Sequence, residues 1–231
     1  MAEILGVIPA RGGSKGIPGK NIIDLGGRPL VTWTIAAALE TGVFDRLIVS
    51  SDDPDILSVS AQAGTEVDRR AEGLAADHVH AVHVVLDLLE RLGAEGYRPD
   101  VVVMLLPTSP FRRAADVVGA IDRFLEDRPP AVISVTELDK QLIHLRTIDA
   151  AGRLQALVPP EAMTAQRQEQ PPLYGLNGSI YVARPETVLS ARTFHVADAV
   201  GHVMDATSSV DINEPADLDH ARRLIETGVV T

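Results

Sequence analysis

The chain has 231 residues, 45% of them hydrophobic, which suffices for one domain with a full apolar core. Its net charge of −11 argues against a nucleic-acid partner, because phosphate backbones require a basic face. It has no cysteine, which excludes disulfides and thiolate metal sites. No long apolar run predicts a membrane span, and residues 4–9 are too short a run for an export signal. We therefore expect a cytoplasmic protein with neither a nucleic-acid nor a membrane partner.

Short apolar runs and helical patterns alternate over the first 135 residues. Residues 4–9 predict a buried strand, and the run VVVMLL at 101–106 predicts a central strand because all six positions are apolar. The other elements expected here are helix 29–42, strand 46–50, helix 54–63, a long helix capped by Asp77 and ending near Leu92, helix 114–125 and strand 131–135. This alternation predicts an α/β fold with a mostly parallel sheet and helices on both faces.

The pattern weakens between about residues 136 and 176. This stretch contains two Pro-Pro pairs and the polar tract AQRQEQ, and its periodicity fits neither strand nor helix well. We interpret it as an excursion from the core that serves as an arm, a lid or a dimerisation element. Strands at 179–182 and 201–204 and a closing helix at 214–227 complete the expected fold.

A glycine-rich segment, ARGGSKGIPGKN at residues 10–21, directly follows the first strand. Open α/β sheets bind ligands at the carboxyl ends of their strands, so this loop has the position of a binding site. Its glycines allow close backbone approach to phosphate oxygens, and Arg11, Lys15 and Lys20 supply positive charge. The spacing matches neither a Walker A motif nor the dinucleotide fingerprint. The loop predicts a phosphate site, whereas a merely flexible turn would leave its three cations without a role.

Four motifs, in order, resemble those of the acylneuraminate cytidylyltransferases, or CMP-sialic acid synthetases. They are IPARGGSKGIPGKN at 8–21, LPTSPFR at 106–112, NGSIY at 177–181 and DINEPAD at 211–217. The resemblance covers nearly the whole chain and implies one cytidylyltransferase domain over 1–231, with a three-layer Rossmann-like nucleotidyltransferase fold. It implies transfer of CMP from CTP to an acidic acceptor, with Mg²⁺ (or Mn²⁺) and release of pyrophosphate. It also implies a homodimer formed through the arm at about 136–176.

The same resemblance assigns catalytic, nucleotide and metal residues. The catalytic set is Arg11, Lys15, Lys20 and Asp211. Asp211 matches a magnesium ligand, and Asn213 stands where the family has a second aspartate, so the metal site loses one negative charge. Taken alone, Asp211 could simply cap the following helix. The predicted nucleotide-binding residues are Ala10, Arg11, Gly12, Gly13, Ser14, Lys15, Lys20, Asn21, Arg70 and Pro107.

The acceptor residues depart further from the family pattern. Leu106 replaces a glutamine, Gly175 replaces an arginine and His144 replaces a lysine. We interpret these changes as selection of an acceptor other than N-acetylneuraminate, either another nonulosonic or octulosonic acid or a small phosphonate. Arg167 is expected to reach the acceptor across the dimer interface. The predicted acceptor-binding residues are Leu106, Thr108, Ser109, His144, Arg167, Asn177 and Phe194.

Two rival functions remain open, a glycosyltransferase that uses a nucleotide sugar and a non-catalytic nucleotide-binding relative. The Asp53-Pro54-Asp55 sequence has the D-x-D form of metal-dependent glycosyltransferases, but we expect a helix cap there, with Asp52 as a second candidate for facing the nucleotide. We expect His78, His80 and His83 at the surface, since their spacing suits no common metal site. His195 could line the acceptor pocket or lie in the core or at an edge, and Trp33 is expected to pack on the sheet.

Overall fold

The computed structural model describes residues 2–74, 79–139, 145–157 and 172–230. Within these ranges the strands are β1 (Ile4–Pro9), β2 (Asp24–Leu25), β3 (Arg28–Pro29), β4 (Arg46–Ser51), β5 (Glu66–Arg69), β6 (Val101–Leu105), β7 (Ala131–Leu138), β8 (Arg146–Ile148), β9 (Leu154–Ala156), β10 (Leu173–Ala183) and β11 (Val200–Met204). The helices are α1 (Leu30–Thr41), α2 (Pro54–Gln62), α3 (Ala81–Ala94), α4 (Ala114–Asp127), α5 (Pro185–Ala191) and α6 (Pro215–Glu226), with 3₁₀ turns η1 (Lys20–Ile22) and η2 (Glu72–Leu74).

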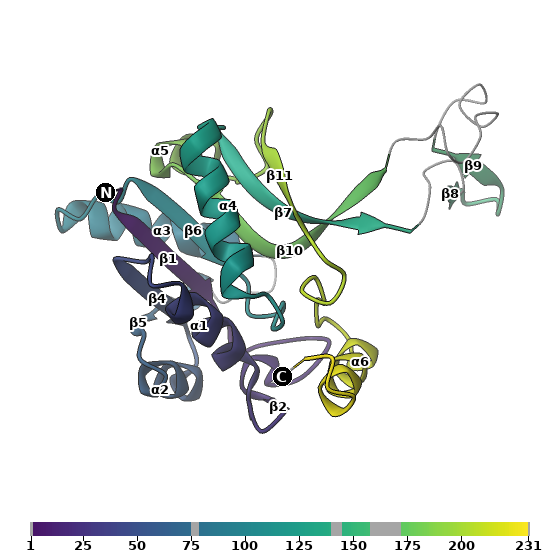
Figure 1. Cartoon of the computed structure of the whole chain (residues 1–231), viewed down its shortest axis with the longest axis horizontal. Helices are drawn as coiled ribbons and strands as arrows, with labels where there is room; N and C mark the ends of the chain where they lie inside the picture. The colour runs from purple at the N-terminus through teal and green to yellow at the C-terminus, as the bar shows by residue number, and fades with distance from the viewer. Residues whose placement is uncertain (1, 75–78, 140–144, 158–171, 231) are drawn as a thin grey trace.

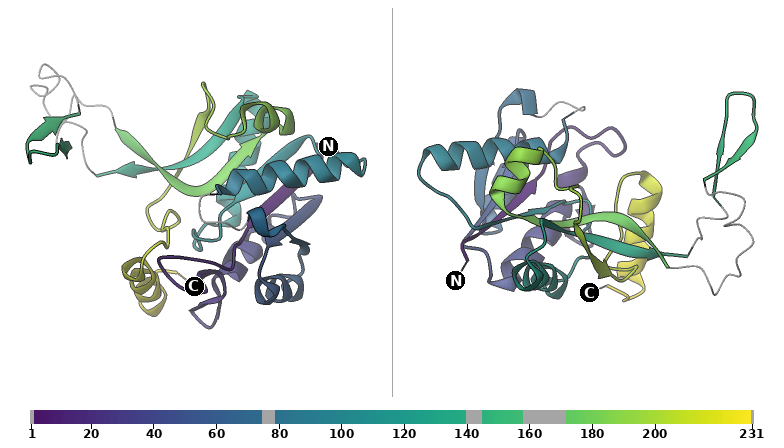
Figure 2. Two further views of the ribbon diagram at one scale, coloured as in Figure 1. Left: turned by 180° about the vertical axis from the view of Figure 1, so that it is seen from behind. Right: turned by 90° about the horizontal axis from the view of Figure 1, so that it is seen from above.

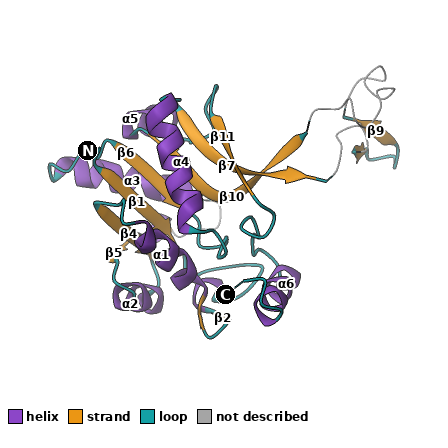
Figure 3. Ribbon diagram, in the orientation of Figure 1, coloured by secondary structure: helices purple, strands orange, loops and turns teal. Residues whose placement is uncertain are grey.

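The main sheet has seven strands in the order β11-β7-β10-β6-β1-β4-β5 (Figure 3). Its neighbouring strands pair in parallel, except that β10 runs antiparallel to both β6 and β7. β6 is buried at all five positions, as its apolar run predicts for a strand covered on both faces. The predicted mostly parallel sheet is confirmed.

Helices cover both faces of this sheet and give it three layers. On one face, side chains of α1, α2 and α4 pack with Ile8, Val103 and Val182. On the other face, α3 and α5 pack with Leu5, Val102 and neighbouring strand residues. Figure 1 shows this arrangement, which confirms the predicted α/β architecture.

Local sequence signals set several helix ends. Asp53 caps α2, and Gly42 ends α1 with φ of 62°, a left-handed conformation that favours glycine. The long helix α3 begins at Ala81 with His80 in the N-cap position and ends at Ala94. Asp77 lies outside the described residues and does not hold the cap position, so that prediction is wrong.

The expected excursion appears where β7 and β10 extend beyond the other strands. β7 continues to Leu138 and β10 begins at Leu173, so both strands are longer than the sequence predicts. The two remain paired along this extension, with Leu173 opposite Leu138, and the small β8–β9 hairpin lies beyond them. Figures 1 and 2 show the paired ends leaving the body of the molecule. The register of β10 shifts between Leu176 and Tyr181, which marks a bulge.

A third apolar cluster lies beside the sheet and holds α6. Trp33 belongs to this cluster, where its indole N–H donates to Leu25 O (2.9 Å) and its ring meets Phe111 edge-on at 5.4 Å between centroids. Trp33 therefore packs against this cluster and not on the sheet as expected. Over the part of the chain that the structure describes, no helix is both long and apolar enough to cross a membrane.

Candidate functional site

The glycine-rich loop, residues 10–21, leaves the carboxyl end of β1 and lies against the start of α2. The Gly12 N–H donates to Asp52 Oδ1 at 3.1 Å. A Cβ atom on Gly12 would lie 2.8 Å from the Cβ of Asp53, so this close approach requires glycine. The other phosphate-binding candidates of this loop differ in solvent exposure. Ala10 is buried, three are half-buried (Arg11, Ser14 and Lys20), and Gly13 and Lys15 are exposed.

The far end of the glycine-rich loop packs against the acidic loop, which we define as residues 211–214. A Cβ atom on Gly16 would lie 2.2 Å from the carbonyl oxygen of Asn213, so no other residue fits without a shift of backbone. Lys20 Nζ donates to Ile212 O at 2.8 Å and to Asn213 Oδ1 at 3.3 Å. The structure thus brings together two predicted motifs that are almost two hundred residues apart in the chain.

The Lys20 ammonium group lies among charges of both signs. Burial lowers the pKa of Lys20 below its usual value, Asp211 and Asp217 oppose this shift, and the positive charge of Arg11 adds to it. The Asn21 Nδ2 group donates to Arg11 O at 2.8 Å and so ties the two ends of the loop together. The result is a partly desolvated cationic centre, which suits the binding of a small polyanion.

Asp211 lies before α6 and does not cap that helix. Glu214 is the N-cap, and Asp217 accepts hydrogen bonds from the N–H groups of Asn213 (2.9 Å) and Glu214 (2.8 Å). Asp211 Oδ2 accepts from Asn213 Nδ2 at 2.6 Å, whereas its Oδ1 is buried and has no hydrogen-bond partner among the described residues. A buried carboxylate oxygen without a partner is costly, so this atom is suited to bind a cation or a donor. The alternative that Asp211 is only a helix cap is wrong.

The oxygens at this position fit a hard cation that shares its coordination with a substrate. Asp211 Oδ1 and Asn213 Oδ1 are the protein oxygens at hand, and Mg²⁺ takes one or two such ligands together with phosphates and water. No cluster of three or more histidine, cysteine, aspartate or glutamate side chains occurs within the described ranges. His80 and His83 lie 6.2 Å apart between ring centroids and belong to no such cluster. His78 lies outside the described residues.

Arg70 is buried where β5 ends, next to the glycine-rich loop. Its Nη2 donates to the Ser50 carbonyl, and its Nε is buried with no hydrogen-bond partner in the described part of the chain. Burial lowers the pKa of Arg70, while the charges of Asp52 and Asp68 raise it and that of Arg11 lowers it. Arg70 and Arg11 are therefore close enough to influence each other, as expected for residues of one nucleotide site.

The segment that follows β6 joins the acidic loop to β10. Pro107 and Ser109 are buried and Thr108 is half-buried. The Thr108 carbonyl accepts from the Ile212 N–H at 2.8 Å, and Ser109 Oγ donates to Asn177 O at 3.4 Å. This segment therefore fixes the position of the acidic loop relative to the sheet.

A cavity of about 570 Å³ opens beside this segment. Its apolar side chains come from β6, the residue after β6, β10 and the segment after α5. Its polar side chains come from the start of α3 and from the segment after α5. The apolar side chains are Met104, Leu106, Tyr181 and Phe194, and the histidine and arginine side chains are His80, His83, Arg192 and His195.

The cavity and the acidic loop meet at Gly178, in the bulge of β10. A Cβ atom on Gly178 would lie 3.8 Å from Leu106 Cδ1 and 3.9 Å from Asp211 Oδ2. Burial, together with the charge of Asp211, raises the pKa of Tyr181 above its usual value. The ring of the buried Phe194 lies 5.7 Å from that of Tyr181 between centroids. A ligand in this cavity would therefore lie next to the Asp211 carboxylate.

Other predicted acceptor residues have different surroundings. Asn177 is buried, its Oδ1 accepts from Ser134 Oγ (2.6 Å), and its Nδ2 donates to Ser209 Oγ (2.9 Å). Its amide is thus engaged within the protein, and a direct acceptor contact by Asn177 stays a prediction. His144 and Arg167 lie outside the described residues.

The D-x-D sequence is a helix cap, as expected. Asp53 Oδ1 accepts from the N–H groups of Asp55 (2.8 Å) and Ile56 (3.3 Å) at the start of α2. His195 is exposed, and its ring meets Tyr181 edge-on at 5.7 Å between centroids on the rim of the cavity.

Asp217 and Arg112 support the site, and neither of them has a role in the sequence-based prediction. Asp217 organises the acidic loop, and its spacing from Glu214 is that of a capping box, a signal that the sequence does contain. Arg112 ends the LPTSPFR motif and is buried, although nothing in the motif itself indicates what its charge contacts.

Three features lie together at the carboxyl ends of the strands: the glycine-rich loop with its cations, the Asp211 carboxylate with an oxygen that has no described partner, and the adjoining cavity. This combination is typical of a nucleotide-dependent transferase. The match to a family of known proteins agrees with this class. The chain belongs to the cytidylyltransferase family, whose model matches residues 5–228. It is therefore a CTP-dependent nucleotidyltransferase, and the predicted relation to CMP-sialic acid synthetases is confirmed.

Individual relatives support the same assignment. The chain is 35% identical over 228 residues to the CMP-N,N'-diacetyllegionaminic acid synthase of Legionella pneumophila, with 97% of each chain covered. It is 29% identical over 216 residues to an N-acylneuraminate cytidylyltransferase of Streptococcus agalactiae, a match that covers 93% of this chain and 51% of that protein. A solved structure of CMP:2-keto-3-deoxy-manno-octonic acid synthetase complexed with CTP superposes with a TM-score of 0.75 at 17% identity, covering 98% of this chain and 100% of that one. This likeness confirms the Rossmann-like nucleotidyltransferase fold.

Proposed function

We propose that this enzyme joins CMP from CTP to a nonulosonic acid, an acidic 2-keto sugar, and releases pyrophosphate. The observation that carries the proposal is the meeting of three features at one place, namely the glycine-rich loop, Asp211 and the cavity beside Leu106. The relatives named above for diacetyllegionaminic acid and N-acylneuraminate support the acceptor class.

The glycine-rich loop binds the triphosphate of CTP in this proposal. Its backbone N–H groups and the cations Arg11, Lys15 and Lys20 neutralise the negative charge that develops on the leaving pyrophosphate. Arg70 and Pro107 contact the nucleoside part. The acceptor hydroxyl then attacks the α-phosphorus in line with the departing oxygen, and the enzyme contributes mainly by positioning the reactants.

A divalent cation, Mg²⁺ or Mn²⁺, completes the site. Asp211 would hold it through the buried Oδ1, with the amide oxygen of Asn213 as a second candidate ligand. When bound, the ion supplies positive charge next to the phosphates. The single carboxylate makes this a weaker protein site than one with two aspartates, so we expect the ion to bind together with CTP.

The acceptor occupies the cavity of about 570 Å³, next to Asp211. Leu106, Tyr181 and Phe194 present apolar surface there, which favours acceptors that carry methyl groups, such as acylamino or deoxy positions, over fully hydroxylated chains. Thr108 and Ser109, in the segment that follows Leu106, remain candidates for acceptor contacts, as do His144 and Arg167.

The chain also acts as a homodimer in the cytoplasm in this proposal. The paired extension of β7 and β10 exposes Tyr174 and Leu176, and large exposed apolar side chains on a protruding element suit contact with a second copy. The absence of cysteine is compatible with a reducing compartment.

A pyrophosphate-release assay with CTP and Mg²⁺ tests the function. The acceptor panel contains N,N'-diacetyllegionaminate, N-acetylneuraminate, 3-deoxy-manno-octulosonate and a small phosphonate, and mass spectrometry identifies the CMP conjugate. We expect the diacetylated acid to give the highest kcat/KM. Pyrophosphate release with the phosphonate alone would replace the proposal, and so would sugar transfer from a nucleotide sugar without pyrophosphate.

A second prediction concerns acceptor choice at Leu106. Leu106→Gln places an amide where the cavity now offers apolar contact to an acceptor. We therefore expect the ratio of kcat/KM for the diacetylated acceptor to kcat/KM for a hydroxylated acceptor to fall by about tenfold, because one or two methylene contacts have about this effect on specificity. Leu125→Gln is the matched control, since Leu125 is exposed on α4 far from the cavity lining. An unchanged ratio in Leu106→Gln would show that this side chain does not set specificity.

A further inference from the structure

The guanidinium group of Arg112 is buried between the segment after β6 and strand β10, where it contacts the backbone of Leu106. The residue is 2% exposed. Its Nε donates to Ser179 Oγ at 2.9 Å and its Nη2 donates to Leu106 O at 2.5 Å, whereas Nη1 is buried with no hydrogen-bond partner in the described ranges. Arg112 therefore holds the backbone of Leu106, the residue that begins the cavity wall, against β10.

A buried guanidinium is costly unless a nearby negative charge or hydrogen bonds compensate for its lost hydration. Burial lowers the pKa of Arg112 to about 9, and the charges of Asp116 and Asp211 oppose that shift. Asp116 already accepts from the backbone N–H of Arg113 (2.9 Å) and pairs with the Arg113 side chain (3.1 Å). Asp211, in contrast, keeps one buried oxygen without a hydrogen-bond partner among the described residues. Arg112 and Asp211 are thus opposite charges that each retain an unfilled polar atom.

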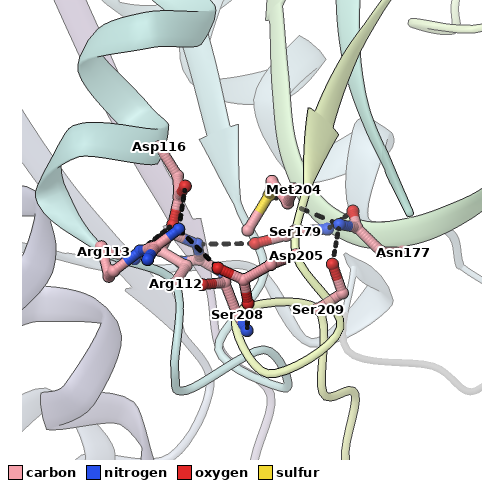
Figure 4. Close-up of polar contacts among 9 residues, drawn as sticks. All are labelled: Arg112, Arg113, Asp116, Asn177, Ser179, Met204, Asp205, Ser208 and Ser209. Atoms are coloured by element: carbon pink, nitrogen blue, oxygen red, sulfur yellow. Dashed lines mark hydrogen bonds and ion pairs between the residues drawn. The ribbon is translucent and has the colours of Figure 1, made fainter. Parts of the chain in front are cut away.

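A chain of hydrogen bonds also runs from Arg112 through β10 to Ser209, close in sequence to Asp211. Asn177 Oδ1 accepts from the N–H of Ser179, which bonds Arg112 through its hydroxyl, and Asn177 Nδ2 donates to Ser209 Oγ at 2.9 Å. Ser209 stands two residues before Asp211. Figure 4 shows these side chains converging from the segment after β6, from β10 and from the segment after β11.

We propose that Arg112 is a positioning residue that sets Leu106 and Asp211 in one arrangement, so that acceptor binding and metal binding depend on the same buried cation. The proposal rests on the function proposed above. Outer contacts of this kind around a metal ligand change metal affinity by about 10- to 100-fold when they are removed. The glycine-rich loop does not contact Arg112 in any hydrogen bond described above, so CTP binding without metal depends on it little.

Arg112→Met tests this, because methionine retains much of the volume and removes the charge. Three constants are measured: the Mn²⁺ Kd in the presence of a non-hydrolysable CTP analogue by electron paramagnetic resonance, the acceptor KM, and the CTP Kd without metal by calorimetry. We expect the first two to rise about tenfold and the third to change by less than about twofold. Arg112→Lys, which keeps the charge, should recover part of the Mn²⁺ affinity.

Arg123→Met is the matched control. Arg123 lies on α4, its side chain is 47% exposed, and it pairs with the exposed Asp127. We expect all three constants to stay within about twofold of wild type. A merely structural role for Arg112 would weaken CTP binding as much as metal binding, and that result would overturn the proposal, as would unchanged Mn²⁺ affinity in Arg112→Met.

If Arg112→Met does not fold, Ser179→Ala is the variant to measure. It removes one hydrogen bond to the guanidinium, and we expect a rise of about threefold in the Mn²⁺ Kd, since a single neutral partner contributes less than the charge. An unchanged Kd in this variant would count against the proposal. The proposed function fails separately, if wild-type enzyme binds Mn²⁺ and CTP but releases no pyrophosphate with any keto sugar acid.

Discussion

Lys20 occupies the contact between the two loops that form the nucleotide end of the site. Its ammonium group holds the carbonyl of Ile212 and the amide oxygen of Asn213, and a bound triphosphate would compete for the same donor. In the proposed function, the side chain therefore holds the two loops together before CTP binds and is a charge partner for phosphate afterwards. Both roles depend on the positive charge.

We expect Lys20→Ala to lower turnover by about 10²-fold or more, the usual effect of removing one transition-state charge partner. Arg98→Ala is the control. It removes an exposed cation that precedes β6, at the end of that strand away from the glycine-rich loop. Steady-state rates of pyrophosphate release compare the two variants. Turnover near that of wild type in Lys20→Ala would exclude the assigned role.

The pH dependence follows from the same residue. Since burial lowers the pKa of Lys20, its positive charge is lost at a lower pH than that of an ordinary lysine, and the rate should fall on the alkaline side below pH 10.5. Lys20→Arg, which stays charged, should move this alkaline limb to higher pH. Profiles of kcat/KM against pH provide the measurement, and an identical limb in both enzymes would assign it to another group.

Individual residues also mark what the sequence can and cannot predict. The cations of the glycine-rich loop, Asp211 and Leu106 follow from motif position. The need for glycine at position 16 does not, because it arises from contact with Asn213, almost two hundred residues away. The same applies to Arg112, whose partners on β10 and after β6 adjoin only in the folded chain.

At the scale of elements, one face of the sheet next to its β11 edge carries exposed apolar side chains. The strand register places Leu176, Val135 and Val203 opposite one another across β10, β7 and β11. Leu176 is 60% exposed and Val203 is 53% exposed. An exposed edge strand with apolar side chains pairs or packs readily with another chain, which supports the proposed homodimer.

We expect the double variant Leu176→Asp with Val203→Asp to shift the protein from dimer to monomer, because a charge buried in an apolar interface is strongly unfavourable. Light scattering gives the mass, and circular dichroism checks that the fold persists. Val67→Asp on β5, at the opposite edge of the sheet, is the control and should leave the dimer intact. A double variant that remains dimeric would place the interface elsewhere.

Strand lengths show where prediction from sequence stops at this scale. The buried parts of β7 and β10 are apolar and were predicted, whereas their outer parts contain Glu137 and Tyr174 and pair with each other beyond the other strands. Their pairing depends on contacts between residues far apart in sequence, which no local pattern encodes.

For the whole molecule, alternation of apolar runs with helical patterns is sufficient to predict three layers and a mostly parallel sheet. It does not reveal the antiparallel direction of β10, since the excursion that reverses the chain has weak periodicity. Nor does it reveal the cavity proposed for the acceptor, whose lining comes from β6, β10, α3 and the segment after α5. A cavity of this kind is a property of the folded arrangement and requires the structure.

The reversed direction of β10 has a mechanical consequence. A strand parallel to β6 would enter the sheet at the end away from the candidate site, but β10 enters from the arm and passes the candidate site within its first six residues, at Asn177 and Gly178. Gly178 has a φ of 69°, and this left-handed turn lies in the bulge next to Leu106 and Asp211. One continuous strand therefore connects the arm to the glycine that lies between Leu106 and Asp211, so in the proposed dimer a contact made by the arm would act directly on the spacing of these two residues.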